Sequence, residues 1–352
     1  MNEPSSSAIP AVVEEALWRL MNGYLTTQLL YVVAKLGVAD VLAEGPQTSQ
    51  ALAERVGADP SALRRILRGL TLDGVFEEQD HGRFALTEIG ACLREGVAGS
   101  FRGPAVARAE LYYAAAAGLL ATARDGRPAF EHVHGERFFD DLARNPEREA
   151  VFQASMAGRA ELEASAIVAA FDFRPFRRLV DVGGGQGILL RAVLQAAPER
   201  SAVLVDRAAA VQQASERLSA AGLAGRFECV AADFFDAVPA GADAYLVSRV
   251  LHDWDDADAS RILVTCRAAM PVASRLIVVE ALLPERARDA PSVIRMDVHM
   301  LELLGARERT EREYRELLAS AGLRVSRVVP TQATTGLSSG LSVIEATPTP
   351  PA

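Results

Sequence analysis

The sequence predicts an α/β protein in which a Rossmann-like domain follows a smaller helical domain of winged-helix type. The first observation is that short apolar runs alternate with helical patterns after residue 177, which is typical of a doubly wound sheet. The second is that two short capped helices precede a hairpin pattern within the first 100 residues. A length of 352 residues is more than one compact domain usually needs, so we expect two unequal domains.

Composition and charge argue against several classes of partner. Half of the residues are apolar, so a large core can form, and the net charge is −9. An acidic chain lacks the basic face that nucleic acid or an anionic membrane requires, and no apolar run reaches the ~18 residues of a membrane span. Cys92, Cys229 and Cys266 have neither zinc-site nor disulfide spacing. We therefore expect a cytoplasmic protein with no metal, nucleic-acid or membrane partner.

The N-terminal domain begins with a helical pattern from Val12 to Ala34 whose apolar residues cover more than one face. Such a helix is buried on more than one side, for example against a second subunit, which favours a homodimer. A capped helix that ends at Gly57 follows, and Asp59-Pro60-Ser61 opens the next helix. Asp80-His81-Gly82 separates two short β patterns and predicts a hairpin.

Five apolar runs predict the strands of the second domain, and each is followed by a helix-like stretch. These runs are 179–182, 202–205, 227–230, 244–247 and 276–279. Between the two domains, from Ala105 to Ala170, the chain is mostly helical. The Pro-rich stretch after Thr347 is expected to be disordered.

Three acidic or glycine-rich segments follow successive strands. Asp181-Val182-Gly183-Gly184-Gly185-Gln186-Gly187 ends the first strand and opens a helix. Asp206 ends the second strand, where a carboxylate can accept both hydroxyls of a ribose. Asp233 follows the third strand, and Phe234 beside it can lie against an adenine face. In open α/β sheets these strand ends form the ligand crevice, so the sequence predicts a nucleoside site.

The glycine spacing distinguishes between nucleotides. Counting a dinucleotide fingerprint from Gly183 puts Ile188 where the third glycine should be. An acid two residues before the first glycine also suits a cationic amino group better than a pyrophosphate. The pattern therefore favours S-adenosylmethionine, bound by Asp181, Gly183, Gly185, Gly187, Asp206, Asp233 and Phe234. Arg249 could reach the adenine side, and a solvated arginine is the equal alternative.

His252 lies just past the fourth strand, at the same crevice. A phenol titrates near ~10, so at neutral pH a positioned base adds ~10²–10⁴ in rate to its methylation, and histidine is the usual base. Glu280, at the end of the next strand, is a candidate partner for the second ring nitrogen. We therefore expect His252 to be the general base.

The chain resembles the plant-type small-molecule O-methyltransferases (caffeate- and hydroxyindole-like), including bacterial relatives in antibiotic, phenazine and polyketide pathways. Four motifs carry the resemblance, together with Glu280 and the segment Phe130 to Gly135, and it covers about residues 12 to 347. They are Leu179 to Gly187, Asp233-Phe234-Phe235, Leu251-His252-Asp253-Trp254-Asp255-Asp256 and Gly305-Ala306-Arg307-Glu308-Arg309-Thr310. The resemblance implies a winged-helix-like dimerisation domain, a final antiparallel strand and no metal. It also implies Glu280 and Glu308 as carboxylates that flank the base.

We expect four segments along the chain. They are a dimerisation domain over 11–100, a helical linker over 101–170 that contributes to the substrate pocket, an S-adenosylmethionine-binding domain over 171–347 and a disordered tail over 348–352. The candidates for contact with the acceptor are Met156, Asp253, Met296, His299 and Met300, with core packing as the alternative for the methionines. His132 and His134 are expected in a loop, and no third metal ligand accompanies them.

The expected function is O-methylation of an aromatic or polyketide-like small molecule, and N-methylation remains an alternative. A second alternative is diverged chemistry on the same fold, such as hydroxylation or decarboxylation, although the retained His252 favours methyl transfer. A third is a DNA-binding regulator, because Arg64, Arg65 and Arg68 make one helix of the winged-helix pattern basic.

Overall fold

The computed structural model describes residues 9–332 and 340–349, which form two compact units. The first unit contains the chain up to Tyr113 together with Pro146–Gly158. The second contains Ala114–Asn145 and the chain from Arg159 onward. The segment 101–170 is therefore shared between the two units.

The first unit starts with two helices, α1 (Ala11–Met21) and α2 (Gly23–Lys35). The expectation of one helix from Val12 to Ala34 was wrong at Asn22, where the backbone leaves the helical region (ψ 3°). Asn22 and Gly23 are both poor helix formers, and side by side they break the helix. Large apolar side chains on α1 remain exposed in the single chain, and they include Leu17, Trp18 and Leu20.

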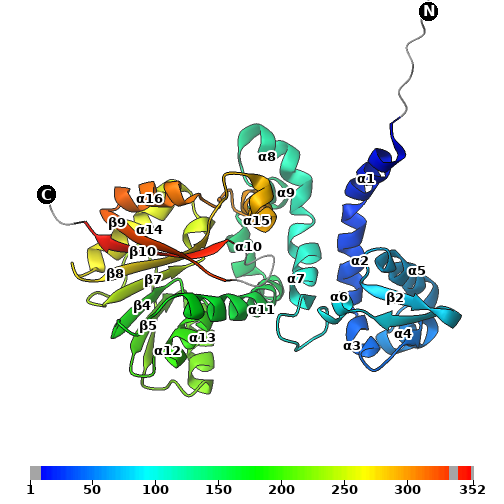
Figure 1. The fold of residues 1–352 in the computed structure, drawn as a ribbon, viewed down its shortest axis with the longest axis horizontal. Helices are drawn as coiled ribbons and strands as arrows, with labels where there is room; N and C mark the ends of the chain where they lie inside the picture. Colours follow the sequence, from blue (N-terminus) through cyan, green and yellow to red (C-terminus); the bar gives the residue numbers. More distant parts are fainter. Residues whose placement is uncertain (1–8, 333–339, 350–352) are drawn as a thin grey trace, which may run out of the picture. The chain divides into compact units, whose positions relative to one another are not determined.

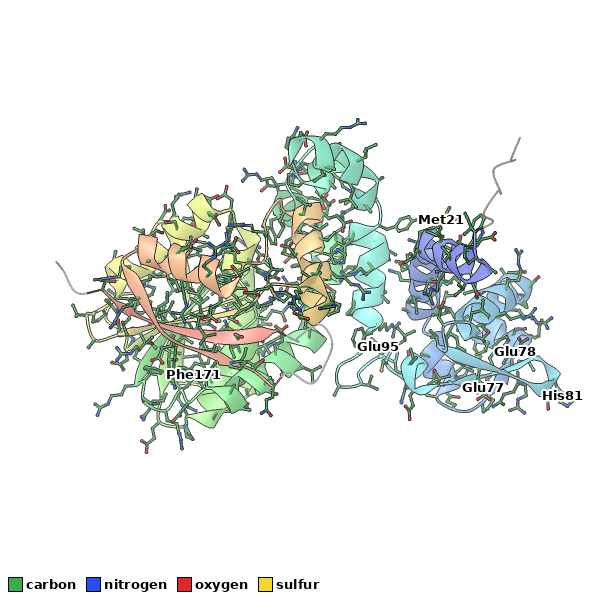
Figure 2. All side chains as sticks on the ribbon, turned by 45° about the horizontal axis from the view of Figure 1, so that its top comes forward. Met21, Glu77, Glu78, His81, Glu95 and Phe171 are labelled. Carbon is green, nitrogen blue, oxygen red and sulfur yellow. The ribbon has the colours of Figure 1, made fainter. Side chains whose placement is uncertain are left out.

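The winged-helix arrangement is confirmed, with side-chain caps where they were expected. Thr48 caps α4 (Ser49–Val56) and Asp59 caps α5 (Pro60–Thr71), each by accepting from a backbone N–H three residues on. The remaining elements are α3 (Val38–Leu42), α6 (Glu88–Ala91) and a three-stranded sheet in the order β1 (Gln47–Thr48), β3 (Arg83–Leu86), β2 (Phe76–Gln79). Figure 2 shows Glu77, Glu78 and His81 on this hairpin.

Helices dominate the middle of the chain. They are α7 (Arg102–Ala107), α8 (Leu119–Asp125), α9 (Ala129–His134), α10 (Phe138–Arg144) and α11 (Pro146–Ala170). The expectation that His132 and His134 lie in a loop was wrong, because both belong to α9. The helix begins after Pro128 and ends at Gly135, which takes a left-handed conformation (φ 77°) that stops it.

The second unit is built on a sheet in which the described residues form seven strands, in the order β6-β5-β4-β7-β8-β10-β9 (Figure 1). The strands are β4 (Arg178–Val182), β5 (Ser201–Asp206), β6 (Phe227–Ala231), β7 (Ala244–Ser248), β8 (Arg275–Ala281), β9 (Leu323–Pro330) and β10 (Leu341–Pro348). The five expected strands are present and parallel, and β10 runs antiparallel to β8. Pro348 pairs with Leu323, so the expected disordered tail does not start there; residues 350–352 lie outside the described residues.

Helices cover both faces of this sheet. One apolar cluster joins the sheet to α14 (Asp256–Ala269) and α16 (Glu311–Ser320), and the other joins it to α12 (Ile188–Ala196) and α13 (Ala208–Ala220). A further helix, α15 (Pro291–Leu303), follows β8. Because β4, β5, β7 and β8 are parallel, their carboxyl ends lie at one edge of the sheet, and the loops that leave this edge carry the candidate site. Within the described ranges, no helix is both long enough and apolar enough to span a bilayer.

Candidate active site

The glycine-rich turn after β4 has a backbone that only glycine adopts easily. Gly183, Gly185 and Gly187 all have positive φ values (70°, 53° and 72°). Gly187 is also the N-cap residue of α12. Gly184 has no room for a side chain, because a Cβ there would lie 2.6 Å from Oδ2 of Asp181. The turn can therefore hold a ligand close to its backbone.

Asp181 lies beneath this turn and is buried. Its Oδ2 has no hydrogen-bond partner within residues 9–332 and 340–349. Burial raises the pKa of Asp181 to about 7, and the charge of Asp206 adds to the increase. A buried carboxyl without a partner is costly, and a ligand ammonium group would supply the missing donor and charge. The site thus fits a ligand that carries a positive charge and no phosphate.

Two further acids border the turn. Asp206 accepts hydrogen bonds from the backbone N–H of Gly185 at 2.8 Å and of Arg207 at 2.7 Å. Asp233 accepts from the backbone N–H of Phe235 at 2.9 Å, which fixes the loop that carries Phe234. The Phe234 ring packs edge-on against Trp254.

His252 is buried in a short 3₁₀ turn, η4 (Leu251–Asp253), at the carboxyl end of β7. Its Nδ1 lies 3.0 Å from Oε1 of Glu308, and its Nε2 lies 3.3 Å from Oδ1 of Asp253. An ionised carboxylate only accepts hydrogen bonds, so the closer contact with Glu308 favours a proton on Nδ1. When the ring is neutral, Nε2 is then the basic nitrogen, and it faces Asp253. A proton acceptor oriented by a buried carboxylate is the arrangement of a general base.

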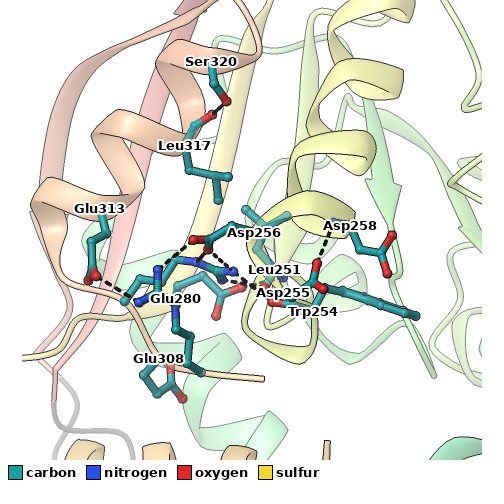
Figure 3. A network of polar contacts seen from close by, with 12 residues as sticks. Leu251, Trp254, Asp255, Asp256, Asp258, Glu280, Glu308, Glu313, Leu317 and Ser320 are labelled. Carbon is teal, nitrogen blue, oxygen red and sulfur yellow. Dashed lines mark hydrogen bonds and ion pairs between the residues drawn. The ribbon is translucent and has the colours of Figure 1, made fainter. Parts of the chain in front are cut away.

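Glu280 has a different position from the one expected, because it does not contact the second ring nitrogen of His252. Its Oε1 accepts from the backbone N–H of Val250 at 3.1 Å and of Leu251 at 2.9 Å, and so holds the turn that precedes the histidine. Figure 3 shows Glu280 and Glu308 together beside Leu251. The partner of the ring is Glu308, whose segment is remote in the sequence.

Arg249 also lies differently from the sequence-based interpretation. Its guanidinium is 3.4 Å from Oε1 of Glu308 and 4.0 Å from Oε2 of Glu280. Its backbone is left-handed (φ 56°), which is strained for a residue other than glycine. The positive charge of Arg249 thus compensates the two carboxylates beside His252, and the assignment of Arg249 to the cofactor remains a prediction.

Comparisons with known proteins decide the family. An O-methyltransferase domain model matches residues 117–324, and an O-methyltransferase dimerisation domain model matches residues 18–96. The chain belongs to the O-methyltransferase family. Both the resemblance and the fold class predicted from the sequence are confirmed.

Three proteins illustrate the similarity of this methyltransferase to others. Phenazine O-methyltransferase PhzM of Lysobacter antibioticus is 41% identical, over 97% of this chain and 98% of the relative. The 8-amino-8-demethylriboflavin N,N-dimethyltransferase of Streptomyces davaonensis is 39% identical, over 86% and 88%. The crystal structure of the O-methyltransferase NcsB1 from neocarzinostatin biosynthesis, in complex with S-adenosylmethionine and 2-hydroxy-5-methyl naphthoic acid, has a TM-score of 0.79 and 36% identity, over 92% of this chain and 96% of that one.

The charges around His252 set its pKa. Burial and the charge of Arg249 lower the pKa of His252. The carboxylates of Asp253, Glu280 and Glu308 act in the opposite direction and outweigh them, so the pKa of His252 lies above its ordinary value. Burial alone would raise the pKa of Glu308, but the charges of His252 and Arg249 hold it below its usual range. Burial raises the pKa of Glu280.

Helix α15 borders this cluster, because Asp297 on it accepts from the backbone N–H of Glu308 at 2.9 Å. Three of the residues expected to contact the methyl acceptor lie on the same helix; they are Met296, His299 and Met300. Met300 is buried and His299 pairs with Glu302 at 2.9 Å. Met156 belongs to the first unit and is exposed there. The contacts of these residues with an acceptor remain predictions.

Sequence reasoning missed Arg309 and the Arg159–Glu163 pair. Arg159 lies on α11, donates to Glu163 at 2.6 Å, and its charge acts on Glu308. An arginine four residues before a glutamate is the ordinary pattern of a solvated helix face, so the sequence gives no signal of burial.

The cluster of His252, Glu280 and Glu308 also has the composition of a metal site. Each of the three residues offers one possible ligand atom, and these atoms lie within 4.8 Å of one another. Because Arg249 already supplies cationic charge there, we keep the prediction of no metal.

Replacing Asp206 by asparagine should weaken the affinity for S-adenosylhomocysteine by ~10-fold or more. An asparagine has one neutral acceptor oxygen, so it cannot accept from the N–H of Gly185 and from both ribose hydroxyls as a carboxylate can. A hydrogen bond to a charged group is worth ~1.5–3 kcal/mol. Isothermal titration calorimetry measures the change. Asp172→Asn, at an exposed ion pair with Arg174, is the control. Equal affinities in the two variants would contradict the assignment of Asp206.

Proposed function

We propose that this methyltransferase transfers a methyl group from S-adenosylmethionine to a phenolic hydroxyl of an aromatic secondary metabolite, with His252 as general base. The donor supplies an electrophilic methyl group on a sulfonium. The observation that carries the proposal is the buried pair of His252 and Glu308, 3.0 Å apart, at the same sheet edge as the glycine turn. Nε2 of His252 takes the proton of the hydroxyl, and Glu308 stabilises the imidazolium that forms.

The donor is held by the residues after β4, β5 and β6. We propose that Asp181 binds its ammonium group, that Asp206 binds its ribose hydroxyls, and that Asp233 and Phe234 border its adenine. The missing partner of Asp181 supports the first assignment. The positive φ values of Gly183, Gly185 and Gly187 support a close approach of the backbone to the donor.

The acceptor is an aromatic ring system, because two of the similar proteins are named as methyltransferases of a phenazine and of a riboflavin derivative, and NcsB1 was crystallised with a naphthoic acid. One of them is an N-methyltransferase by name, so an aromatic amine is the second candidate. A phenol requires removal of a proton that titrates near ~10, whereas a neutral amine attacks without a base. The buried base therefore favours the hydroxyl.

The enzyme is a homodimer that forms through its N-terminal domain. The dimerisation domain model covers residues 18–96, and α1 exposes Leu17, Trp18, Leu20 and Met21. A row of exposed large apolar side chains on one helix is costly unless a partner covers it. Sedimentation equilibrium of the purified chain measures the state directly, and a monomer at micromolar concentration would contradict the proposal.

The alternative of a DNA-binding regulator finds little support in the wing. Arg68 and Arg64 lie 3.0 and 3.8 Å from Glu78, so their charges are compensated. The hairpin β2–β3 itself carries Glu77, Glu78 and Asp80; Figure 2 labels the two glutamates. Acidic side chains at this position repel a phosphate backbone.

Incubation with methyl-labelled S-adenosylmethionine tests the proposed function. The acceptors should be matched pairs of hydroxy- and amino-substituted phenazines and naphthoates, with product analysis by mass spectrometry. We expect the labelled methyl group on the former phenol oxygen, as an aryl methyl ether. Exclusive labelling of amines would overturn the O-methyltransferase assignment for this chain, and a hydroxylated or decarboxylated product without label would support the diverged-chemistry alternative.

A further inference from the structure

Arg309 is a fully buried arginine for which the proposed chemistry has no use. It lies between Glu308, the partner of the base, and Thr310, which caps α16 through a capping box with Glu313. Burying a guanidinium is costly unless its donors are satisfied. The groups that accept its hydrogen bonds therefore indicate its role.

The side chain of Arg309 binds both sides of the turn that carries His252. Nη1 donates to the carbonyl oxygen of Leu251 at 2.8 Å, and Nη2 donates to that of Trp254 at 2.8 Å. Nε donates to Oδ1 of Asp256, in the first turn of α14, at 2.9 Å. Figure 3 shows Leu251, Trp254 and Asp256 gathered at this point. The planar fork thus holds one residue before His252 and another two residues after it.

The backbone of Arg309 is fixed as well. Its carbonyl oxygen accepts from the N–H of Leu283 at 3.0 Å, and it forms a β-bridge with Leu282, directly after β8. The side chain and the backbone of one residue therefore connect the end of β8, the turn η4 and the start of α16. Because Glu308 is its neighbour, any shift of Arg309 changes the distance between the base and its carboxylate.

We propose that Arg309 is a positioning residue, which sets the His252 ring against the Glu308 carboxylate by holding the two carbonyl groups on either side of the histidine. This inference rests on the proposed role of His252 as base. The guanidinium is planar and has rigidly directed donors, whereas a lysine ammonium reaches one carbonyl at most from a flexible chain. The other carbonyl would be left buried without a donor, and the turn would be free to move.

Arg309→Lys should lower kcat by ~10–100-fold and leave the KM values of donor and acceptor within ~3-fold of wild type, because only the alignment of the base is lost. The affinity for S-adenosylhomocysteine should stay unchanged by calorimetry. Arg307→Lys is a matched control, because Arg307 also binds Asp256, at 2.8 Å, and Glu313, at 3.1 Å, from a half-exposed position. We expect wild-type kinetics for Arg307→Lys.

A second readout separates positioning from general stability. In Arg309→Lys the NMR-titrated pKa of His252 should fall, because Glu308 raises that pKa and would lie farther away. The resonance is assigned by its loss in His252→Asn. The other charged groups that act on the ring are Arg249, Asp253 and Glu280. Asp253 belongs to the same turn as His252 and moves with it.

If Arg309→Lys does not fold, Asp256→Asn weakens the anchor of Nε and leaves both carbonyl contacts in place. It should shift the pKa of His252 in the same direction by a smaller amount. The role of Arg309 would be overturned if the pKa of His252 were unchanged in whichever of these two variants folds. It would also be overturned if the affinity for S-adenosylhomocysteine fell by as much as kcat. Activity that survives in His252→Asn would instead overturn the proposed base, and the NMR shift in Arg309→Lys would still report on positioning.

Discussion

Replacing His252 by asparagine should lower kcat by ~10²–10⁴-fold and leave the affinity for S-adenosylhomocysteine within a few-fold of wild type. The asparagine amide can still donate to Glu308, so no buried carboxylate loses its partner. It cannot accept the hydroxyl proton, because an amide is not a base near neutral pH. Initial rates at saturating donor, together with calorimetry, measure the two quantities separately.

A matched control is His132→Asn. His132 also pairs with a carboxylate, since its Nε2 lies 3.1 Å from Oδ1 of Asp125, but it belongs to α9 and has no place in the proposed mechanism. We expect its kcat to equal that of the wild type. Turnover of His252→Asn within ~3-fold of wild type would show that the acceptor loses its proton without this side chain.

Glu308→Gln should lower kcat by ~10²-fold and move the acid limb of the pH–rate profile to lower pH. The carboxylate holds Nδ1–H at 3.0 Å and stabilises the imidazolium that forms during transfer. A glutamine keeps the shape of the side chain and loses its charge. The positive charge of Arg249, 3.4 Å away, then acts on His252 with less compensation.

The direction of the pH shift follows from the charges. The base works only when neutral, so the rate rises with pH through the pKa of His252, which lies above its ordinary value. Glu308 contributes to that increase, and its removal must lower the pKa. Glu302→Gln makes the same change at a buried glutamate 2.9 Å from Nδ1 of His299, and should leave the acid limb in place. An acid limb that stays or rises in Glu308→Gln would contradict the proposed pairing.

The sheet could be predicted almost completely from the sequence, because buried parallel strands leave a strong local signal. All five expected runs are strands, and the two expected capped helices of the first unit are present, with Thr48 and Asp59 as their caps. The break at Asn22 and the helical setting of His132 were missed. Both depend on the balance between weak local preferences and packing, which a single sequence leaves undecided.

The sequence predicted those residues of the site that lie at or just past the end of a strand, because the carboxyl ends of parallel strands meet at one edge of the sheet. That rule placed Asp181, Asp206 and His252 near one edge of the sheet. It could not decide whether Glu280 or Glu308 contacts the ring, because both lie beside the same turn and only the direction of the side chains separates them. Arg309 was not singled out, since an arginine between a glutamate and a capping threonine has the pattern of a solvated helix start.

The glycine turn has one more consequence, for how the enzyme responds to its own product. In the proposed assignment, Asp181 beside Gly184 and Asp206 beside Gly185 bind the ammonium group and the ribose, which are identical before and after the methyl group has left. Only the sulfur changes, so the demethylated nucleoside keeps nearly all of the recognition. We therefore expect the demethylated product to compete with the donor for the site and to slow turnover as it accumulates.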